Sequence, residues 1–434
     1  MIPRFLYTLC WYLAAPLVGL RLAWRARHQP EYLQHVGERL GRYANPGAGP
    51  FIWLHAVSVG ETRAAAPLVH ALLDAHPDCR LLLTHMTPTG RATAAELFGK
   101  LAPRVLSVYL PYDFPWAVLR FIRCFRPRIG ILMETELWPN LVHGCRRTGT
   151  PLVMVNARLS ERSARGYRKA GPLAREAFAD LTAIGAQTDG DANRLQALGA
   201  RRVQVTGNIK FDSSPTPGLL ELGKAFRNRF GPRPVLLAAS TREGEEAPLL
   251  EALSLRCPPH VLLVLVPRHP QRFDEVARLV ARSGLKLQRR SSNEPVMADT
   301  RVWLGDSMGE MYAYYAAADV ALIGGSWEKL GGQNPIEAGA VGCPAIVGPH
   351  TFNFKLVCEQ AIEAGAALRA KDLPHGLNLA LELIETPSQR KSMSEEGRRF
   401  TALHRGATGR TLALLAPLIP KNSNRPQAHT TQPL

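Results

Sequence analysis

A carboxylate placed directly after an apolar run is the first feature of this 434-residue chain that could carry chemistry. The run at residues 51–55 leads through Ser58 and Gly60 into Glu61, and apolar residues then recur at helical spacing over residues 62–73. This pattern predicts a buried strand, a tight turn and a helix start. In a parallel sheet, Glu61 would lie at the carboxyl end of the strand, where open α/β folds bind ligands. Capping is the alternative role, because an acid in a first helical turn favours the helix dipole.

Four loops in the second half of the chain place glycine, serine or charged residues directly after apolar runs. They lie at residues 266–270, 306–311, 324–326 and 331–338. Pro335 stands where a helix should begin, and Glu337 falls in its first turn. Glycine lets backbone N–H groups approach an anion at a helix start, and a carboxylate can accept both hydroxyls of a ribose. Together these loops predict a nucleotide site.

The elements that must position these residues form two sets of alternating strand-like and helical stretches, which predicts two α/β domains with parallel sheets. We expect the following organisation: a hydrophobic N-terminal anchor (1–28), a first α/β domain (29–212), a proline-containing linker with a short helix (213–233), a second α/β domain (234–420) and a polar, disordered tail (421–434).

The charge balance calls for an anionic partner, because 53 Lys and Arg residues face 36 Asp and Glu residues, a formal net charge of +17. Nucleic acid, an anionic membrane and a phosphorylated substrate are the candidates. The arginines are dispersed and no nucleic-acid-binding signature occurs, which disfavours nucleic acid.

The seven cysteines lack CxxC spacing and indicate a reducing compartment. No ligand-spaced cluster suggests a metal, and we interpret His55 and His85 as packing residues rather than site residues.

The N-terminal stretch at residues 5–20 is apolar and aromatic, with Arg4 before it and Arg21, Arg25 and Arg27 after it. It is short for a membrane span and lacks a cleavage site, so we expect it to enter the interface of an anionic membrane. A buried N-terminal helix is the alternative. If the stretch inserts, its positive flank keeps the following domain cytoplasmic.

The chain contains no Walker A pattern, and no GxGxxG follows the first strand, so phosphoryl and hydride transfer are disfavoured. Two α/β domains, a nucleotide bound by the second and a carboxylate presented by the first are the layout of a two-domain glycosyltransferase.

A series of motifs then resembles the bacterial 3-deoxy-D-manno-octulosonic acid (Kdo) transferases of lipopolysaccharide synthesis. The resemblance extends from the N-terminal stretch to about residue 360, with small departures at Ala56, where serine is frequent, and Ile209, where leucine is. The motifs lie at residues 55–61, 86–90, 110–113, 133–140, 156–160, 207–212, 266–270, 334–337 and 348–355.

The resemblance implies a GT-B fold, in which two Rossmann-like domains face each other across a cleft behind an N-terminal membrane-anchor helix. It implies inverting transfer of Kdo from CMP-Kdo to a tetra-acylated, bis-phosphorylated lipid A precursor, lipid IVA. The reaction would take place on the cytoplasmic side of the bacterial inner membrane, at an anionic surface, with no metal, no cofactor and no nucleic acid.

The resemblance also implies roles for individual residues. Glu61 matches the position of the family's general base, and Glu134 and Lys210 match positions that stabilise the transition state. The CMP-binding segments match Pro267, Arg268, Met308, Gly309, Glu310, Asn334 and Glu337. We expect acceptor contacts at Ser58 and Gly60. The lipid A phosphates and anionic headgroups suit Arg158, Arg162, Arg165 and Arg168, for which a solvated helix face is the alternative.

A helix start lowers the pKa of an acid, whereas burial and the like charge of Glu134 raise it, and we predict that the raising effects prevail at Glu61. Two other functions stay open at this point. One is a membrane-associated GT-B transferase that uses a different nucleotide sugar, such as a UDP-sugar. The other is a nucleotide-binding protein without catalysis.

Overall fold

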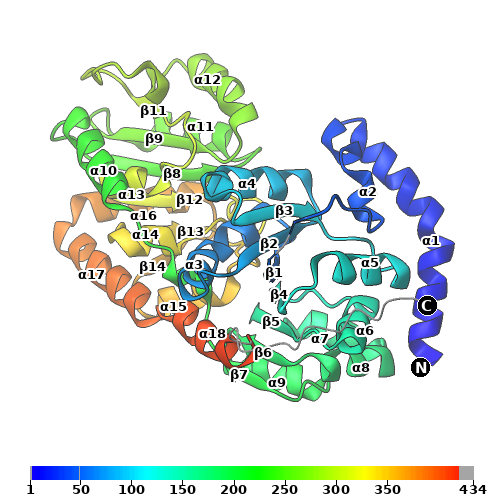
Figure 1. Ribbon diagram of the computed structural model, residues 1–434. Helices are drawn as coiled ribbons and strands as arrows, with labels where there is room; N and C mark the ends of the chain where they lie inside the picture. Colours follow the sequence, from blue (N-terminus) through cyan, green and yellow to red (C-terminus); the bar gives the residue numbers. More distant parts are fainter. Residues whose placement is uncertain (1, 48, 420–434) are drawn as a thin grey trace, which may run out of the picture. The chain divides into compact units, whose positions relative to one another are not determined.

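The computed structural model describes residues 2–47 and 49–419 (Figure 1). The chain divides into two units, Met1–Asp212 with Arg405–Leu434, and Ser213–His404. The cleft expected between them stays a prediction.

The first unit is built on a parallel seven-stranded sheet in the order β3-β2-β1-β4-β5-β6-β7. Side chains of β1 alternate between two cores, with Phe51 and Trp53 in one and Ile52 and Leu54 in the other, so both faces of the sheet are covered. The strand order reverses between β1 and β4, which makes their carboxyl ends the topological switch point. The strands are β1 (Phe51–His55), β2 (Arg80–His85), β3 (Val105–Tyr109), β4 (Ile129–Met133), β5 (Leu152–Ala157), β6 (Ala183–Ala186) and β7 (Val203–Val205).

The helices of the first unit begin where the sequence offers capping groups. Ser58 caps α3 and Thr87 caps α4, each through a side-chain oxygen that accepts a backbone N–H. The helices are α1 (Ile2–Ala26), α2 (Val36–Arg39), α3 (Val59–Ala75), α4 (Pro88–Phe98), α5 (Pro115–Phe125), α6 (Pro139–Thr148), α7 (Glu161–Lys169), α8 (Pro172–Asp180), α9 (Asp189–Ala197) and α18 (Ala407–Leu415).

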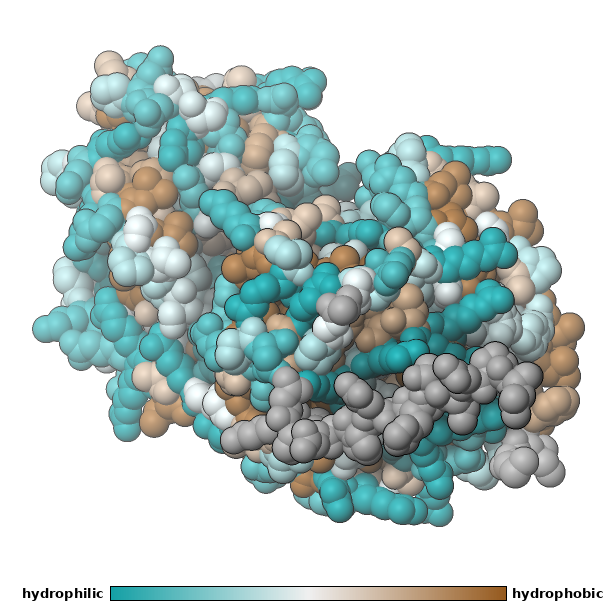
Figure 2. All heavy atoms as spheres, in the orientation of Figure 1, coloured by the Kyte–Doolittle hydropathy of each residue, from teal (hydrophilic) through white to brown (hydrophobic). Residues whose placement is uncertain are grey.

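Helix α1 is part of the first unit rather than a detached anchor. It runs beside α5 and α6 in Figure 1 and contacts α6 and α8. It is also long and apolar enough to cross a membrane, with a mean hydropathy of 1.4. Figure 2 shows apolar side chains in brown along the edge of the molecule that α1 occupies, interspersed with hydrophilic ones.

The second unit repeats the architecture with a parallel seven-stranded sheet in the order β10-β11-β9-β8-β12-β13-β14, which reverses between β8 and β12. The strands are β8 (Val235–Thr241), β9 (Leu262–Pro267), β10 (Leu287–Arg289), β11 (Val302–Leu304), β12 (Val320–Ile323), β13 (Ala345–Val347) and β14 (Ala367–Arg369). The helices are α10 (Pro217–Phe230), α11 (Glu246–Arg256), α12 (Phe273–Arg282), α13 (Met311–Ala317), α14 (Ile336–Val341), α15 (Lys355–Glu363), α16 (Leu373–Glu385) and α17 (Pro387–Leu403). Two helix-covered parallel sheets confirm the predicted α/β class.

Two predicted boundaries are wrong. The short helix expected within the linker at 213–233 is α10, because Thr216 caps the helix and Pro217 occupies its first turn, where a proline costs no hydrogen bond. These residues belong to the second unit and do not form a separate linker. Helix α10 packs closely on α13 of the second unit, with Gly223 against Ala313 and Ala316.

Residues 405–419 were expected in the second domain, but they return to the first unit. The carboxylate of Asp212 accepts the N–H of Gly406 at 2.6 Å and the N–H of Thr408, and α18 then packs on α3. Arg410 adds a bond from Nε to the carbonyl oxygen of Thr206, 2.9 Å long. The tail predicted at 421–434 lies outside the described residues.

Candidate functional site

The turn between β1 and α3 holds Glu61 by both carboxylate oxygens. The backbone N–H of Val57 donates to Oε2 at 2.8 Å, and the hydroxyl of Ser58 donates to Oε1 at 2.8 Å. Ser58 is also the N-cap of α3, and its Oγ accepts the N–H of Glu61 at 3.4 Å, so the two residues form a variant of the capping box in which the acid bonds to Val57 N–H and not to the N–H of the N-cap residue. The capping role considered from the sequence is therefore real, and it fixes the rotamer of a half-buried carboxylate at the switch point of the sheet.

The environment of Glu61 raises its pKa from 4.5 to about 7. Burial is the largest cause, because it disfavours the charged form, and the negative charges of Glu134 and Glu136 act in the same direction. The bonds from Val57 and Ser58 oppose these effects without cancelling them. The predicted direction is confirmed, and a carboxylate with this pKa can accept a proton near neutral pH.

Glu134 follows β4, across the switch point from Glu61. Its Oε1 accepts from Nζ of Lys210 at 2.9 Å, so the structure brings together the two residues expected to stabilise the transition state. Glu134 has a φ of 57°, in the left-handed region that costs a non-glycine residue about 1–2 kcal/mol. The backbone N–H of Glu134 donates to the Val155 carbonyl oxygen at 2.9 Å, which fixes this conformation against β5.

Asn156, near the end of β5, positions the turn that carries Lys210. Its Oδ1 accepts the N–H of Ile209 at 3.0 Å, and its carbonyl oxygen accepts Nε2 of Gln187 at 3.0 Å. Asn156 is buried and also left-handed, with a φ of 53°. Asparagine tolerates this conformation better than most residues. No role was predicted for Asn156, although it is the first residue of the motif at residues 156–160.

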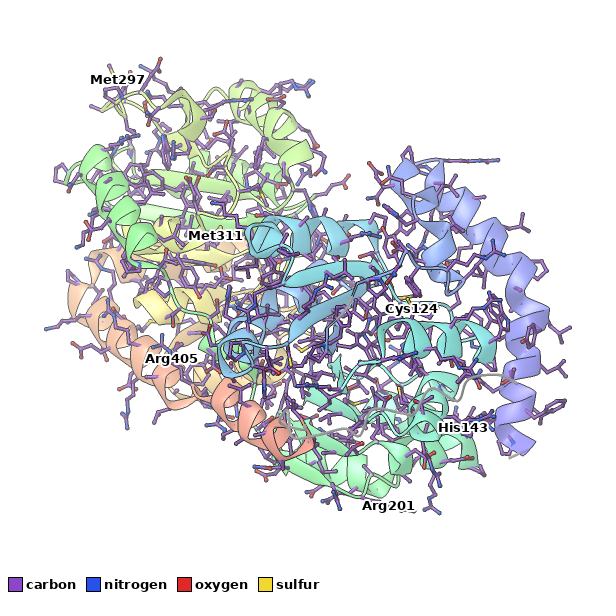
Figure 3. The ribbon with its side chains drawn as sticks, in the orientation of Figure 1. Cys124, His143, Arg201, Met297, Met311 and Arg405 are labelled. Carbon is purple, nitrogen blue, oxygen red and sulfur yellow. The ribbon has the colours of Figure 1, made fainter. Side chains whose placement is uncertain are left out.

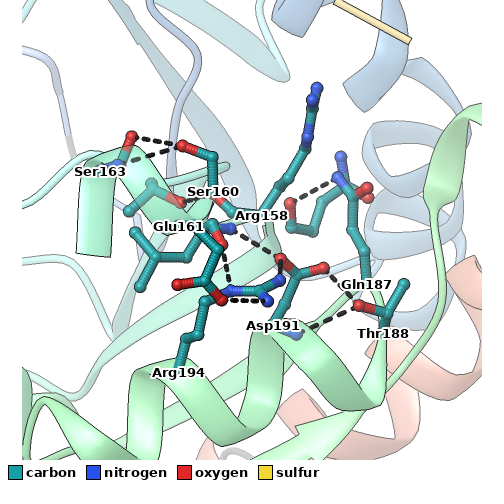
Figure 4. A network of polar contacts seen from close by, with 11 residues as sticks. Arg158, Ser160, Glu161, Ser163, Gln187, Thr188, Asp191 and Arg194 are labelled. Carbon is teal, nitrogen blue, oxygen red and sulfur yellow. Dashed lines mark hydrogen bonds and ion pairs between the residues drawn. The ribbon is translucent and has the colours of Figure 1, made fainter. Parts of the chain in front are cut away.

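The arginines predicted to contact the acceptor lie after β5 and on α7. Arg162 and Arg165 are exposed, whereas Arg158 is half-buried and points away from the ion pairs of Arg194 (Figure 4). Those ion pairs join Arg194 to Glu161 at 3.1 Å and to Asp191 at 3.0 Å. Asp191 in turn accepts the N–H of Leu159 at 2.9 Å, so the network fixes the chain between Arg158 and α7.

His55 and His85, at the ends of β1 and β2, are structural. Both are fully buried, and burial lowers the pKa of His55 to about 3 and that of His85 to about 4, so each is neutral at physiological pH. Nδ1 of His85 lies 2.9 Å from the carbonyl oxygen of Ala56, and Nδ1 of His55 lies 2.9 Å from Oγ1 of Thr84. These contacts bind the two strand ends to each other, as interpreted from the sequence.

In the second unit, the residues expected to bind CMP follow the strands β9, β11 and β12 of one sheet. Pro267 ends β9, and the N–H of Arg268 bonds back to the Thr241 carbonyl oxygen of β8 at 2.9 Å. Met308 and Gly309 follow β11, and both are exposed. Since these strands are parallel neighbours, their carboxyl ends lie at the same edge of the sheet.

The two acids expected in the CMP site, Glu310 and Glu337, bond to neighbouring side chains. Glu310 pairs with Arg290 at 3.1 Å, and Glu337 accepts Nδ2 of Asn334 at 3.2 Å. Oδ1 of Asn334 accepts the N–H of Ile336 at 3.1 Å, so Asn334 fixes the start of α14 and its acid together.

A buried acid that the sequence interpretation missed holds the glycine loop after β12. Glu245 accepts the N–H of Arg242 at 2.8 Å, of Gly325 at 2.8 Å and of Trp327 at 3.1 Å. Gly324 is required here, because a Cβ at this position would lie 2.5 Å from the carbonyl oxygen of Ser240. The loops after β8 and β12 are thus tied together at the switch point of the second sheet.

Among the described residues, no group of three or more His, Cys, Asp or Glu side chains could hold a metal ion. The roles of the individual site residues, and the absence of a metal from the reaction, stay predictions.

Two doubly wound parallel sheets with polar loops at both switch points define the fold as GT-B. A glycosyltransferase from Rickettsia africae ESF-5 has the same fold, with a TM-score of 0.57 and 13% identity over 87% of this chain and 100% of that chain.

Sequence comparisons identify the family. The family model for 3-deoxy-D-manno-octulosonic-acid transferase (kdotransferase) matches residues 34–213. The 3-deoxy-D-manno-octulosonic acid transferase of Bordetella pertussis is 48% identical over 95% of this chain and 98% of its own length. That of Haemophilus influenzae is 38% identical over 96% and 99%. The chain belongs to the Kdo transferase family, which confirms the predicted family, fold and enzyme class.

Proposed function

We propose that this enzyme transfers Kdo from CMP-Kdo to the tetra-acyldisaccharide 1,4'-bisphosphate lipid A precursor, lipid IVA, in the biosynthesis of the lipopolysaccharide core. The observation that carries the mechanism is Glu61, held by both oxygens at the switch point with a pKa of about 7. Its neighbour Glu134 is paired with Lys210 at 2.9 Å. Family membership supports Kdo as the transferred sugar.

The reaction forms a bond between an acceptor hydroxyl oxygen and the anomeric carbon of Kdo, with inversion. The bond from that carbon to the phosphate oxygen breaks, and CMP leaves with the electron pair. Glu61 takes the proton of the attacking hydroxyl, and the Glu134–Lys210 pair stabilises the charge that develops in the transition state.

CMP-Kdo would be bound by the loops of the second unit. The guanidinium of Arg268 suits the phosphate, and Glu337 suits the ribose hydroxyls. Gly309, with a φ of 79°, allows backbone N–H groups to approach the ligand. Pro267, Met308, Glu310 and Asn334 shape the rest of this site.

The acceptor is anionic and lipid-linked, and the first unit offers features suited to both properties. Ser58 and Gly60 lie beside Glu61, where the reacting hydroxyl must be held. Arg158, Arg162 and Arg165 would bind phosphate, which accounts for part of the basic excess.

We further propose that α1 lies at the surface of the inner membrane with the catalytic units on the cytoplasmic side. Its exposed face carries large apolar side chains, with Phe5 68%, Leu13 72% and Leu17 67% exposed. Arg21 and Arg25 complement anionic headgroups. Its other face is bound to α6 and α8, which favours an in-plane position over a span.

The test uses the purified full-length chain with CMP-Kdo and lipid IVA. We expect CMP release and a product heavier by Kdo. In Glu61→Gln we expect a rate about 10²–10⁴-fold lower, the contribution of a general base. Glu96→Gln is the matched control, because Glu96 is 55% exposed and pairs at the surface with Arg63.

Three outcomes would contradict the proposal. Glu61→Gln that transfers Kdo at the parent rate would exclude the assigned base. Preferred use of a UDP-sugar in competition with CMP-Kdo would indicate another transferase. Binding of CMP by the parent without turnover would indicate a nucleotide-binding protein.

A further inference from the structure

Helix α1 has two faces with different surroundings. Exposed and half-buried residues alternate along it with helical period, and Phe5, Leu9, Leu13, Leu17 and Leu20 are all on the exposed face. The half-buried face includes Arg4, Tyr7, Thr8 and Trp11. That face lies against α6, which carries His143 (Figure 3). Burial is the largest cause that lowers the pKa of His143, and the positive charge of Arg4 is the second.

The inner face makes polar bonds that a membrane anchor does not need. The hydroxyl of Tyr7 donates to Oδ2 of Asp113 at 2.9 Å. The hydroxyl of Thr8 shares its one hydrogen between Oδ1 of Asn140, 3.1 Å away, and the carbonyl oxygen of Arg4 within α1, 2.9 Å away. Asp113 is fully buried and Asn140 is 3% exposed. Hydrogen bonds to a buried carboxylate are among the stronger ones in proteins, so this face is fixed to the unit specifically rather than by apolar contact alone.

Asp113 also caps α6 from outside the helix. Trp138 occupies the N-cap position and makes no capping bond of its own. Instead, the carboxylate of Asp113 accepts the N–H of Asn140 at 2.9 Å and of Leu141 at 2.8 Å, and its carbonyl oxygen accepts Nδ2 of Asn140 at 2.7 Å. Tyr7 and Thr8 therefore complete the network that fixes where α6 begins.

The start of α6 is one end of the loop that carries the site carboxylates. Trp11 of α1 stacks on Trp138, with ring centroids 6.4 Å apart and an interplanar angle of 23°. Nε1 of Trp138 donates to Oε2 of Glu136 at 3.0 Å. Two residues earlier is Glu134, paired with Lys210. A continuous series of contacts thus leads from α1 to the charges beside Glu61.

We infer that Tyr7, Thr8 and Trp11 are positioning residues of the active site, which hold the segment 134–140 so that Glu134 and Glu136 keep their places beside Glu61. The inference rests on the proposed role of Glu61 and separates two roles of one helix. The exposed face would bind the membrane, and the inner face would support the chemistry even when no membrane is present.

The two roles are tested in detergent solution with the full-length chain. The inner-face variant combines Tyr7→Phe and Thr8→Val, which remove two hydroxyls with little change in volume. The matched outer-face variant combines Leu13→Ser and Leu17→Ser. Transfer from CMP-Kdo to lipid IVA in mixed micelles gives kcat and KM, and sedimentation with vesicles that contain phosphatidylglycerol gives membrane binding.

We expect the inner-face variant to lose at least about fivefold in kcat with an unchanged KM for CMP-Kdo, because small displacements of catalytic groups are costly. The acidic limb of its pH–rate profile should move to lower pH, since a loosened segment relieves the burial of Glu61 and the repulsion from Glu134 and Glu136. The outer-face variant should keep both values in micelles and lose vesicle binding.

If the inner-face variant loses activity only because less of it is folded, its pH–rate profile will be unchanged. That result would overturn the inference, and so would an unchanged kcat. Trp11→Leu serves if the inner-face variant does not fold, because it removes the ring that stacks on Trp138 and leaves the bonds that Tyr7 and Thr8 donate in place. The loosened segment should again move the limb of Glu61 to lower pH. An unmoved limb contradicts the inference. If Glu61→Gln is inactive while these variants match the parent, only this inference fails and the proposed function stands.

Discussion

Replacing Glu61 by glutamine removes the ionisable group and keeps a side chain of the same length. We expect this variant to be nearly inactive and, at alkaline pH, more stable than the parent. The reason is that the pKa of Glu61 is raised from 4.5 to about 7 in the fold. At about 1.4 kcal/mol for each pKa unit, ionising this carboxyl costs about 3 kcal/mol more in the folded than in the unfolded state.

The pH dependence follows from where the proton is held. Below about pH 4.5 the carboxyl of Glu61 is protonated in both the folded and the unfolded state. Between pH 4.5 and about 7 the folded state holds more protons than the unfolded state. The free energy of unfolding therefore falls as pH rises through this window, and the full cost is present above about pH 7. Glutamine avoids that cost, so its advantage should grow over the same window.

The gain is smaller than the full cost, because the carboxylate accepts bonds from Val57 and Ser58 with two oxygens, whereas glutamine has one acceptor oxygen, and rearranging these contacts costs about 1 kcal/mol. A net gain of roughly 1–2 kcal/mol at pH 8 should raise Tm by roughly 2–8 °C, and the gain should vanish near pH 5. Thermal unfolding of parent and variant at both pH values measures it.

Glu96→Gln is again the control, because Glu96 forms only a surface pair with Arg63. Its effect should stay within about 0.5 kcal/mol at both pH values. A stability difference between Glu61→Gln and the parent that does not change between pH 5 and 8, or a variant less stable at pH 8, would refute the reasoning.

Three further substitutions test the rest of the site. Ser58→Ala removes a hydroxyl that lowers the pKa of Glu61, so the acidic limb of kcat/KM should move up from about 7, by up to about 1 pH unit; a limb that stays or falls contradicts this. Lys210→Met should lower kcat by about 10–10²-fold, whereas the surface residue Lys224, paired with Glu221, should tolerate the same change; equal rates would exclude transition-state stabilisation by Lys210. Arg268→Met should raise KM for CMP-Kdo by about tenfold in initial-rate assays, and an unchanged KM would place the phosphate elsewhere.

The sequence predicts elements well where local signals agree. The strand at 51–55 is an apolar run followed by a capped helix start, and it appears as predicted. Prediction from sequence fails where long-range contacts decide. Nothing near residue 407 reveals that Asp212 will cap α18, so chain order assigned this helix to the wrong unit. The prolines at 215 and 217 suggest a linker, although the helix that begins at Pro217 packs on α13 of the second unit.

The site shows the same division between local and long-range information. Glu61 could be singled out because the sequence places it after an apolar run, whereas Glu134 was expected from the family resemblance. The influence of Glu136 on Glu61 and the bond from Asn156 to the turn of Lys210 depend on distances between segments that sequence does not give. Likewise, the apolar pattern of α1 predicts a membrane face and hides the hydroxyl of Tyr7 that binds Asp113.

Capping and catalysis were posed as alternatives for Glu61, and the geometry is compatible with both roles at once. The capping bonds from Val57 and Ser58 lower the pKa, as expected at a helix start, yet burial exceeds them. A purely structural cap would be better served by an exposed acid, whose low pKa stabilises the fold, or by a neutral side chain. This fold instead keeps a carboxylate whose ionised form is destabilising at neutral pH. Such a residue is expected where a base is needed, and the capping bonds hold its oxygens in place while burial raises its basicity.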